Sequence, residues 1–242
     1  MKKNQTSEPV EDFSAALKLA REHFNRAFDE RLKTKDHYET YYRMSEALLV
    51  LLQLKTGFRV GDLLTRATRN AVKELTVYDS GKNRLVPHLV LLEQKTEQRR
   101  KPERKVVLDD DTVRKIQQHS EFLADAFPEV VKLLGAGALD DLPIFYNPKT
   151  SKPLTRQWAD NRLRGGERRS TELGDALRGM TRGRRISTHS LRKTYAHKLY
   201  QHTGYNINYV SDALGHANVT TTKHYLNIAE ATNVDIHLKA LE

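Results

Sequence analysis

The chain has 242 residues, no cysteine and a formal net charge of +10, from 41 Lys and Arg against 31 Asp and Glu. Without cysteine, disulfide scaffolds, thiolate metal sites and thiol nucleophiles are excluded, and the basic excess favours a polyanionic partner such as nucleic acid. The N-terminus lacks the apolar stretch of a signal peptide, and the longest apolar run, residues 47–52, is too short to cross a bilayer. We therefore expect a soluble, cytoplasmic protein without a membrane partner.

Helical periodicity marks the first part of the chain. Apolar residues recur at helical spacing over residues 11–32, and a second helix, about 41–55, is apolar nearly all round, which predicts deep burial. Gly57 is expected to end the second helix as a C-cap, and a short helix over residues 60–64 follows.

Three β-prone segments come next, at residues 73–78, 86–93 and 104–108. DSGKN between the first two is a turn signal, and the charged KTEQRRKPE between the last two predicts an exposed hairpin tip. The sequence therefore predicts a small antiparallel β-sheet within a mainly α protein, an α+β fold.

The remainder is predicted to be helical, with loops at GAGAL, NPKTSKP, GGERRS and RGMTRGRR. Asp109 to Asp111 can cap a helix that runs to about residue 126. The other expected helix caps are Thr155, Thr188, Asn206 and Asn218, and Gly204 and Gly215 are expected to end helices.

Short motifs carry side chains suited to phosphate chemistry. TGFRVGDLL (56–64) places Arg59 at a helix start, and EQKT (93–96) places Lys95 where a strand gives way to the hairpin tip. HSLR (189–192) places His189 and Arg192 on one helical face, because residues three apart are neighbours there.

The segment LGHANVTTTKHYL (214–226) contains His216 and, nine positions later, Tyr225. Taken singly, each of these motifs has an ordinary explanation. An ion pair with Asp62 would explain Arg59, surface exposure would explain Lys95, and helix capping would explain the histidines.

Taken together, the order and spacing of the motifs resemble the catalytic signature of the tyrosine recombinases, the phage integrase family, over roughly residues 40–230. TGFRVGDLL resembles the first-arginine box, THSLRKTYA the H-x-x-R box, DALGHANVTTTKHYL the closing box, and EQKT the strand that carries the family lysine. The resemblance implies the tyrosine recombinase catalytic-domain fold for residues 36–242. Residues 1–35 would then be an N-terminal extension instead of a full core-binding domain, so we expect a compact recombinase or an isolated catalytic domain.

The resemblance also implies how these residues act on a phosphodiester. The two arginines would hold its non-bridging oxygens bidentately, and the two histidines would add hydrogen bonds or help to move a proton. A tyrosine hydroxyl, with a pKa near 10, needs such positive surroundings to attack at neutral pH. By resemblance, Tyr225 forms a 3′-phosphotyrosyl link to DNA, Lys95 protonates the leaving 5′ oxygen, and strands are exchanged without ATP.

A metal ion is the competing explanation for a basic, histidine-containing nuclease. A metal site needs carboxylates at ligand spacing beside the histidines, and neither HSLR nor GHANV provides one. The acidic triplet at residues 109–111 is better explained by the helix dipole. We therefore expect no metal and no other cofactor.

Three basic clusters could contact the DNA backbone, although a single charge run is more often a solvated face. The predicted DNA-binding residues are Arg99, Arg100, Lys101, Arg156, Arg162, Arg164, Arg168, Arg169, Arg184 and Arg185, and the first cluster also contains Arg104 and Lys105.

The resemblance implies double-stranded DNA as partner and a homotetramer on two DNA sites, with an accessory DNA-bending protein as a further candidate. It implies a nucleoid-associated enzyme from a prokaryote or a mobile element. Two alternatives stay open: a strand-passing enzyme of the type IB topoisomerase kind, and a DNA-binding accessory protein on a recombinase scaffold. The topoisomerases commonly carry lysine at the position of His189, and decay of an enzyme would be expected to lose at least one of the six residues.

Overall fold

The computed structural model describes residues 7–94, 102–164, 171–182 and 186–226. They belong to two compact units, residues 1–195 and 196–242, and the boundary falls inside helix α9 (Thr188–His202). The described residues form a mainly α protein with small antiparallel sheets, as the sequence predicts.

The helices of the larger unit before α9 are α1 (Phe13–Glu30), α2 (His37–Thr56), α3 (Val60–Arg66), η1 (Arg69–Ala71), α5 (Asp110–Ala126), α6 (Pro128–Leu134), η2 (Ala136–Asp140), α7 (Arg156–Arg164) and α8 (Glu172–Gly179). Its strands are β1 (Val72–Asp79), β2 (Lys82–Leu91), β3 (Arg104–Val107), β4 (Tyr146–Asn147) and β5 (Lys152–Pro153). The C-terminal unit contains α10 (Ile207–Ala213) and α11 (Val219–Tyr225).

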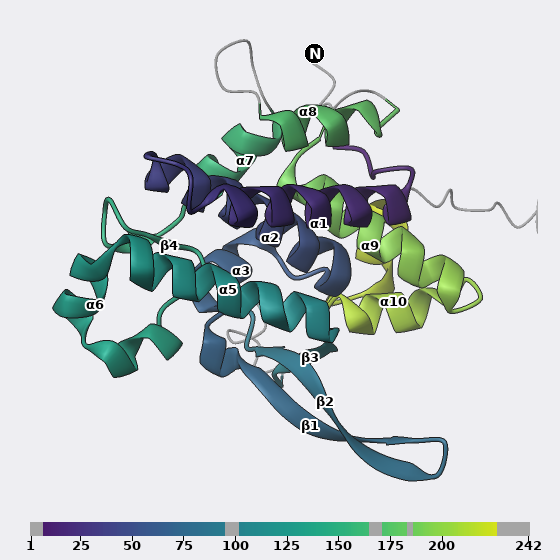
Figure 1. The fold of residues 1–242 in the computed structure, drawn as a ribbon. Helices are drawn as coiled ribbons and strands as arrows, with labels where there is room; N and C mark the ends of the chain where they lie inside the picture. The colour runs from purple at the N-terminus through teal and green to yellow at the C-terminus, as the bar shows by residue number, and fades with distance from the viewer. Residues whose placement is uncertain (1–6, 95–101, 165–170, 183–185, 227–242) are drawn as a thin grey trace, which may run out of the picture. The chain divides into compact units, whose positions relative to one another are not determined.

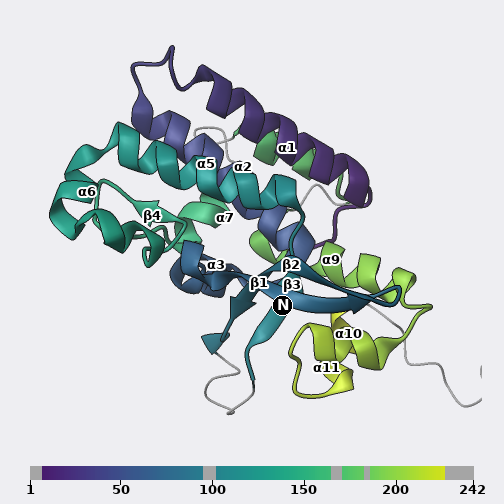
Figure 2. The same ribbon diagram turned by 60° about the horizontal axis from the view of Figure 1, so that its bottom comes forward.

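Helix α2 is the centre of the larger unit. Every residue from Met44 to Leu54 is buried, which agrees with the nearly all-round apolar sequence of this segment. Helices α1 and α5 lie along α2 in both views (Figures 1 and 2). Burial of each leucine here contributes about 1.5–3 kcal/mol to stability. Helix α2 therefore supplies a large part of the apolar surface buried in the core.

Helix α2 begins at His37, four residues before the predicted start near residue 41. The side chain of Asp36 accepts a hydrogen bond from the backbone N–H of Glu39 at 2.9 Å and so caps the helix. The prediction was wrong because the polar sequence KTKDH contains this cap and shows no apolar periodicity. The predicted end of the helix is confirmed, since Gly57 adopts the left-handed conformation with φ +59°.

The three-stranded antiparallel sheet has the predicted order β1-β2-β3. Asp79 pairs with Lys82, which leaves Ser80 and Gly81 as a two-residue turn with positive φ at both positions. Such turns match the twist of a hairpin, and the β1–β2 hairpin extends away from the helices of its unit (Figure 1). The predicted tip KTEQRRKPE lies mostly outside the described residues, and so does GGERRS.

Several predicted loops contain regular structure. GAGAL forms the short helix η2, directly after α6, whose first residue Pro128 is favoured at a helix start. NPKTSKP forms the β4–β5 hairpin, and Ser151 has the positive φ that its turn requires. Helix α8 precedes most of the predicted RGMTRGRR loop, and the side chain of Thr171 caps it by accepting from the N–H of Gly174 at 3.0 Å.

Helix α9 begins with a reciprocal pair of serine contacts. The hydroxyl of Ser187 accepts from the N–H of His189, and the hydroxyl of Ser190 accepts from the N–H of Ser187, both at 3.2 Å. Thr188, the predicted cap, instead donates its hydroxyl to Asp160 at 3.2 Å. The prediction was wrong by one position because both neighbours are capping residue types.

In the C-terminal unit, the predicted caps are confirmed. Asn206 accepts from the N–H of Tyr209 at 3.0 Å, and Asn218 accepts from the N–H of Thr221 at 2.9 Å. Gly204 and Gly215 both have the positive φ expected where a helix ends. Across the described ranges of both units, no helix is long and apolar enough to cross a membrane.

The structure predicts a large cost for Gly57→Ala. Alanine at this position would have to adopt a positive φ, which is unfavourable for a residue with a Cβ, and its methyl group would collide with the ring of Tyr195. We therefore expect the free energy of unfolding to fall by about 3 kcal/mol. Gly81→Ala is the matched control, because Gly81 has positive φ and open space around it, and it should cost about 1 kcal/mol. Equal losses in chemical denaturation would contradict the predicted collision.

Candidate active site

Arg59 lies at the junction between α2 and α3, as the N-cap residue of α3 with an extended backbone. Its guanidinium pairs with the carboxylate of Glu93, a residue just beyond the end of β2. Asp62, the partner that the sequence suggested, instead accepts a hydrogen bond from the N–H of Gln94 at 2.8 Å. The guanidinium of Arg59 is therefore tied to a residue that follows β2.

Glu93 gathers three arginines. Its Oε2 pairs with Arg59, and its Oε1 pairs with Arg104 at 2.8 Å and with Arg192 at 3.5 Å. The Glu93 side chain has no exposed area, and the side chains of Arg104 and Arg192 are 13% and 3% exposed. One buried negative charge faces three positive charges, so this cluster, the arginine cluster below, has a positive excess.

Backbone carbonyls at the end of α2 also hold the arginine cluster. Arg192 donates to the carbonyl oxygen of Gly57 at 2.6 Å, and Arg104 donates to that of Thr56. The guanidinium of Arg104 also stacks on the ring of Phe58, 3.9 Å from its centroid. Because carbonyl groups at a helix C-terminus carry partial negative charge, they stabilise the cations without neutralising them.

The pKa of Arg104 is lowered to about 10, chiefly because the side chain is buried. The neighbouring charges of Arg192 and Arg59 also lower this pKa, whereas Glu93 raises it. Arg104 therefore still carries its charge at neutral pH. Fixed guanidinium groups of this kind bind phosphate oxygens through paired N–H donors.

His189 lies one helical turn before Arg192 in α9. Desolvation, followed by the charges of Arg192, Arg156 and Lys193, lowers the pKa of His189 below 6.5, while Asp160 raises it. The imidazole is therefore mostly neutral at pH 7, with one nitrogen that can donate a hydrogen bond and one that can accept a proton.

The C-terminal unit brings His216 and Tyr225 together. Their ring centroids lie 5.4 Å apart at an interplanar angle of 77°, an edge-to-face contact. The Nδ1 of His216 lies 2.8 Å from the hydroxyl oxygen of Thr222, and its backbone N–H donates to the carbonyl oxygen of Ser211 at 2.9 Å. Helix α11, with seven residues, thus holds the tyrosine and the partner of the histidine in one short element.

Lys95 lies outside the described residues, and so do Arg99, Arg100, Lys101, Arg168, Arg169, Arg184 and Arg185. Two other predicted DNA-contacting residues, Arg156 and Arg164, lie on α7 with side chains 64% and 61% exposed. Their contacts with Asp160, at 3.6 and 3.9 Å, are those of loose surface pairs, so both guanidinium groups remain accessible to a phosphate.

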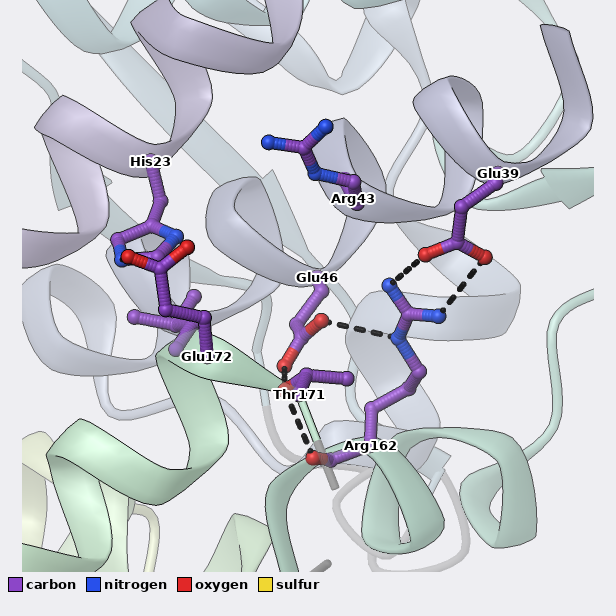
Figure 3. Close-up of a pocket in the computed structure, with 8 residues that line it drawn as sticks. His23, Glu39, Arg43, Glu46, Arg162, Thr171 and Glu172 are labelled. Atoms are coloured by element: carbon purple, nitrogen blue, oxygen red, sulfur yellow. Dashed lines mark hydrogen bonds and ion pairs between the residues drawn. The ribbon is translucent and has the colours of Figure 1, made fainter. Parts of the chain in front are cut away.

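Arg162 is placed differently from its neighbours on α7. Its Nε donates to Glu46 at 2.9 Å, and its two terminal nitrogens donate to Glu39 at 3.0 and 3.2 Å (Figure 3). Its side chain is 15% exposed. Two carboxylates of its own chain occupy the guanidinium of Arg162. Arg162 is therefore not among the residues that we propose to contact DNA.

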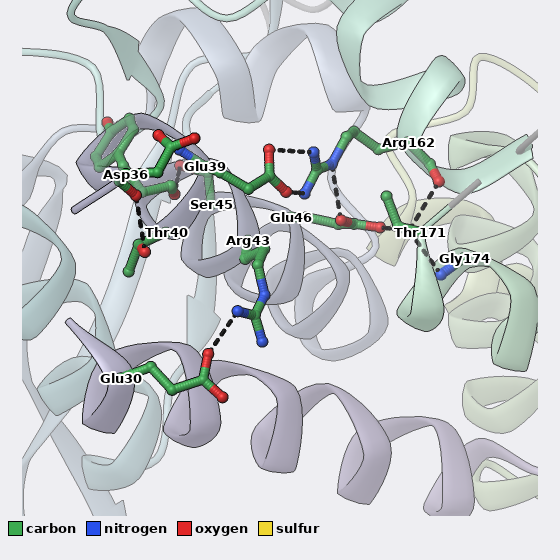
Figure 4. Close-up of polar contacts among 11 residues, drawn as sticks. Glu30, Asp36, Glu39, Thr40, Arg43, Ser45, Glu46, Arg162, Thr171 and Gly174 are labelled. Atoms are coloured by element: carbon green, nitrogen blue, oxygen red, sulfur yellow. Dashed lines mark hydrogen bonds and ion pairs between the residues drawn. The ribbon is translucent and has the colours of Figure 1, made fainter. Parts of the chain in front are cut away.

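Glu46 lies at the centre of this second polar cluster. The hydroxyl of Thr171 donates to it at 2.5 Å, and burial raises its pKa, although Arg162 and Thr171 lower it (Figure 4). A cavity of about 330 Å³ lies beside the cluster and is lined by His23, Arg43 and Glu172, among others. These contacts join α2 to α7 and to the cap of α8. We call this cluster the structural clamp.

Sequence reasoning missed two members of the arginine cluster. In the sequence, Glu93 belongs to the EQKT motif and Arg104 to a basic run, and neither pattern predicts their pairing. The one local signal was a carboxylate at the end of the apolar strand sequence VLLE, since a charge at the end of a buried strand needs a partner. No group of His, Asp and Glu that could hold a metal ion occurs within the residues the structure describes.

The profile of the Phage integrase family matches residues 27–232, and the chain belongs to that family. The fold is similar to that of XerH site-specific recombinase bound to difH substrate, with 18% identity and a TM-score of 0.53 over 97% of this chain and 54% of that one. It is also similar to XerA recombinase, with 16% identity and a TM-score of 0.50 over 98% of this chain and 65% of that one. At these identities the likeness concerns the fold.

A tyrosine recombinase of Pseudothermotoga lettingae is 42% identical over 59 residues, which are 24% of this chain and 20% of that protein. The chain spans about half the length of the XerH chain and matches a fifth of this relative. These matches show the family and the fold.

The electrostatics of His189 can be tested by NMR titration. We expect its imidazole to deprotonate at a pH below 6.5, and Arg156→Gln to raise this pKa because one repelling charge is removed. Asp160→Asn should lower it further, because an attracting charge is removed. Arg26→Gln is the control, since that arginine pairs with Glu172. A wild-type pKa above 6.5 would refute this description of the site.

Proposed function

We propose that the chain is a site-specific DNA recombinase that works through a covalent 3′-phosphotyrosyl intermediate. The observation that carries the proposal is the arginine cluster. The arginine of the first box and the arginine of the H-x-x-R box, 133 positions apart in the sequence numbering, pair with one carboxylate. A pair of fixed guanidinium groups suits a phosphodiester, and membership of the phage integrase family supports DNA as its source.

In the first step, the hydroxyl oxygen of Tyr225 attacks the scissile phosphorus and the bond from phosphorus to the 5′ oxygen breaks. The tyrosine proton passes to a histidine, for which we propose His216, because its ring contacts that of Tyr225. Lys95 gives a proton to the leaving 5′ oxygen. Arg59 and Arg192 stabilise the charge that develops on the non-bridging oxygens, and His189 adds a hydrogen bond.

In the second step, the 5′ hydroxyl of another strand gives its proton to Lys95 and attacks the phosphorus of the phosphotyrosine. The bond from phosphorus to the tyrosine oxygen breaks, and His216 returns the proton to Tyr225. Because one phosphoester replaces another at each step, the bond energy is conserved and neither ATP nor a metal ion is required. The proposed partner is double-stranded DNA bound by a homotetramer on two sites, with an accessory DNA-bending protein as a further candidate. The XerH structure, a complex with difH substrate, supports DNA as partner.

The proposed contacts to the phosphate backbone come from basic residues on α7 and in the segments that flank the strands and helices of the site. They are Arg99, Arg100, Lys101, Arg156, Arg164, Arg168, Arg169, Arg184 and Arg185. Such contacts position a duplex without reading its sequence, so affinity should fall steeply as salt concentration rises.

Covalent trapping tests the proposal. Purified protein is mixed with fragmented DNA from its own replicon, denatured, and the protein-linked strands are sequenced. We expect adducts at one recurring sequence with free 5′ hydroxyls, and none with Tyr225→Phe. Tyr209→Phe, an exposed tyrosine on α10, is the matched control and should keep full activity.

The alternatives give different outcomes. Adducts at unrelated positions would indicate a topoisomerase-like activity. Salt-sensitive DNA binding with no adduct in any variant would favour an accessory DNA-binding protein and would refute the proposed chemistry.

A further inference from the structure

Glu93 is not among the six residues assigned to the chemistry, yet its carboxylate pairs with three arginines. Its two carboxylate oxygens contact different arginines. Oε2 takes Arg59 from the α2–α3 junction, and Oε1 takes Arg104 from β3 and Arg192 from α9. One buried carboxylate therefore links arginines from separate parts of the larger unit.

We propose that Glu93 is a positioning residue, which holds Arg59 and Arg192 in the orientation that the phosphoryl transfer needs and keeps the arginine cluster from dispersing by mutual repulsion. Arg104 is the third cation that the Glu93 carboxylate holds in this arrangement. This inference rests on the proposed function, because it concerns how the same site reaches its geometry.

The backbone on both sides of Glu93 is fixed by α3. Arg66 donates to the carbonyl oxygen of Leu92 at 2.9 Å, and Asp62 accepts from the N–H of Gln94 at 2.8 Å. The Glu93 side chain between these two contacts is fully buried. The backbone contacts on both sides and the burial of the side chain therefore restrict where the Glu93 carboxylate can lie.

Each of the two most buried arginines has a second anchor on a backbone carbonyl. Arg192 donates to Gly57, and Arg104 donates to Thr56 while stacking on Phe58. Two anchors fix both the place and the plane of a guanidinium group. A misplacement of about 1 Å can cost a hundredfold in rate, so orientation at this level matters for the chemical step.

The charge of the arginine cluster also fits the reaction. Three arginines and one carboxylate leave a net charge of +2 by addition of the paired groups. A phosphodiester carries one negative charge, and attack by a tyrosine oxygen adds negative charge in the transition state. A fixed excess of this size complements the transition state more closely than the ground state.

Replacing Glu93 by glutamine should therefore separate binding from chemistry. The cluster gains positive charge, so the affinity for DNA should stay within about threefold or become tighter, since phosphate contacts dominate affinity. The arginines lose their shared anchor, so the rate of adduct formation at saturating protein should fall by about 10- to 100-fold. A purely structural role would lower both the apparent DNA affinity and the apparent rate of adduct formation, because a smaller fraction of the protein would be folded.

The experiment uses the full chain and the DNA site recovered by covalent trapping. Adduct formation is followed in single turnover for the wild type and for Glu93→Gln, with each rate corrected for the folded fraction. DNA affinity is measured by fluorescence anisotropy in a Tyr225→Phe background, with and without Glu93→Gln. Glu46→Gln is the matched control, because Glu46 is also a buried carboxylate paired with an arginine but belongs to the separate clamp.

We expect Glu46→Gln to form adducts within about twofold of the wild-type rate, since surrounding charges outside the site change rates little. Glu93→Asp keeps the charge but is one methylene shorter, so it should slow the reaction by about tenfold. This variant decides the matter if Glu93→Gln does not fold.

Three results would overturn the inference: an unchanged rate in both Glu93 variants, equal slowing in the Glu46 and Glu93 variants, or slowing that weaker DNA binding explains completely. Failure of the proposed function looks different. In that case the wild type itself forms no adduct, and the inference about Glu93 falls with it.

Discussion

The pairing of one buried carboxylate with three arginines is the constraint on which the candidate site depends. Glu93 has to be brought from the end of β2 to the end of α2, and the neighbouring contacts of Asp62 and Arg66 with residues 92–94 achieve this. The left-handed Gly57 ends α2 so that its last carbonyls face the arginines. A buried charge without a partner is costly, so removing any member of the cluster should disturb the others.

The C-terminal unit supplies the residues that would make and break bonds. Thr222 sits one turn before Tyr225 on α11, and its hydroxyl lies at hydrogen-bond distance from His216. The histidine is thus oriented by the same helix that carries the tyrosine. The chemistry that we propose combines two different kinds of group: arginine charges held in place by burial and paired contacts, and a nucleophile carried on a seven-residue helix.

Local features of the fold could be predicted from the sequence, because a few adjacent residues determine them. Gly57, Asn206, Asn218 and the DSGKN turn were each predicted from their own neighbourhood, and each is found as predicted. The internal pairing of Arg162 could not be predicted, because Glu46 lies 116 positions away in sequence. The catalytic residues are predicted from the family resemblance, whereas the contacts of Glu93 with three arginines are visible only in the three-dimensional arrangement.

The most direct test of the account is to identify the residue that carries the DNA. The trapped complex is digested with nuclease and trypsin in the presence of EDTA, and the peptide that retains a nucleotide is sequenced by mass spectrometry. The account predicts a single modified residue, Tyr225, and an unchanged yield of adduct when EDTA is present during the reaction. A nucleotide on another residue, or an adduct that forms only with a divalent metal ion, would contradict it.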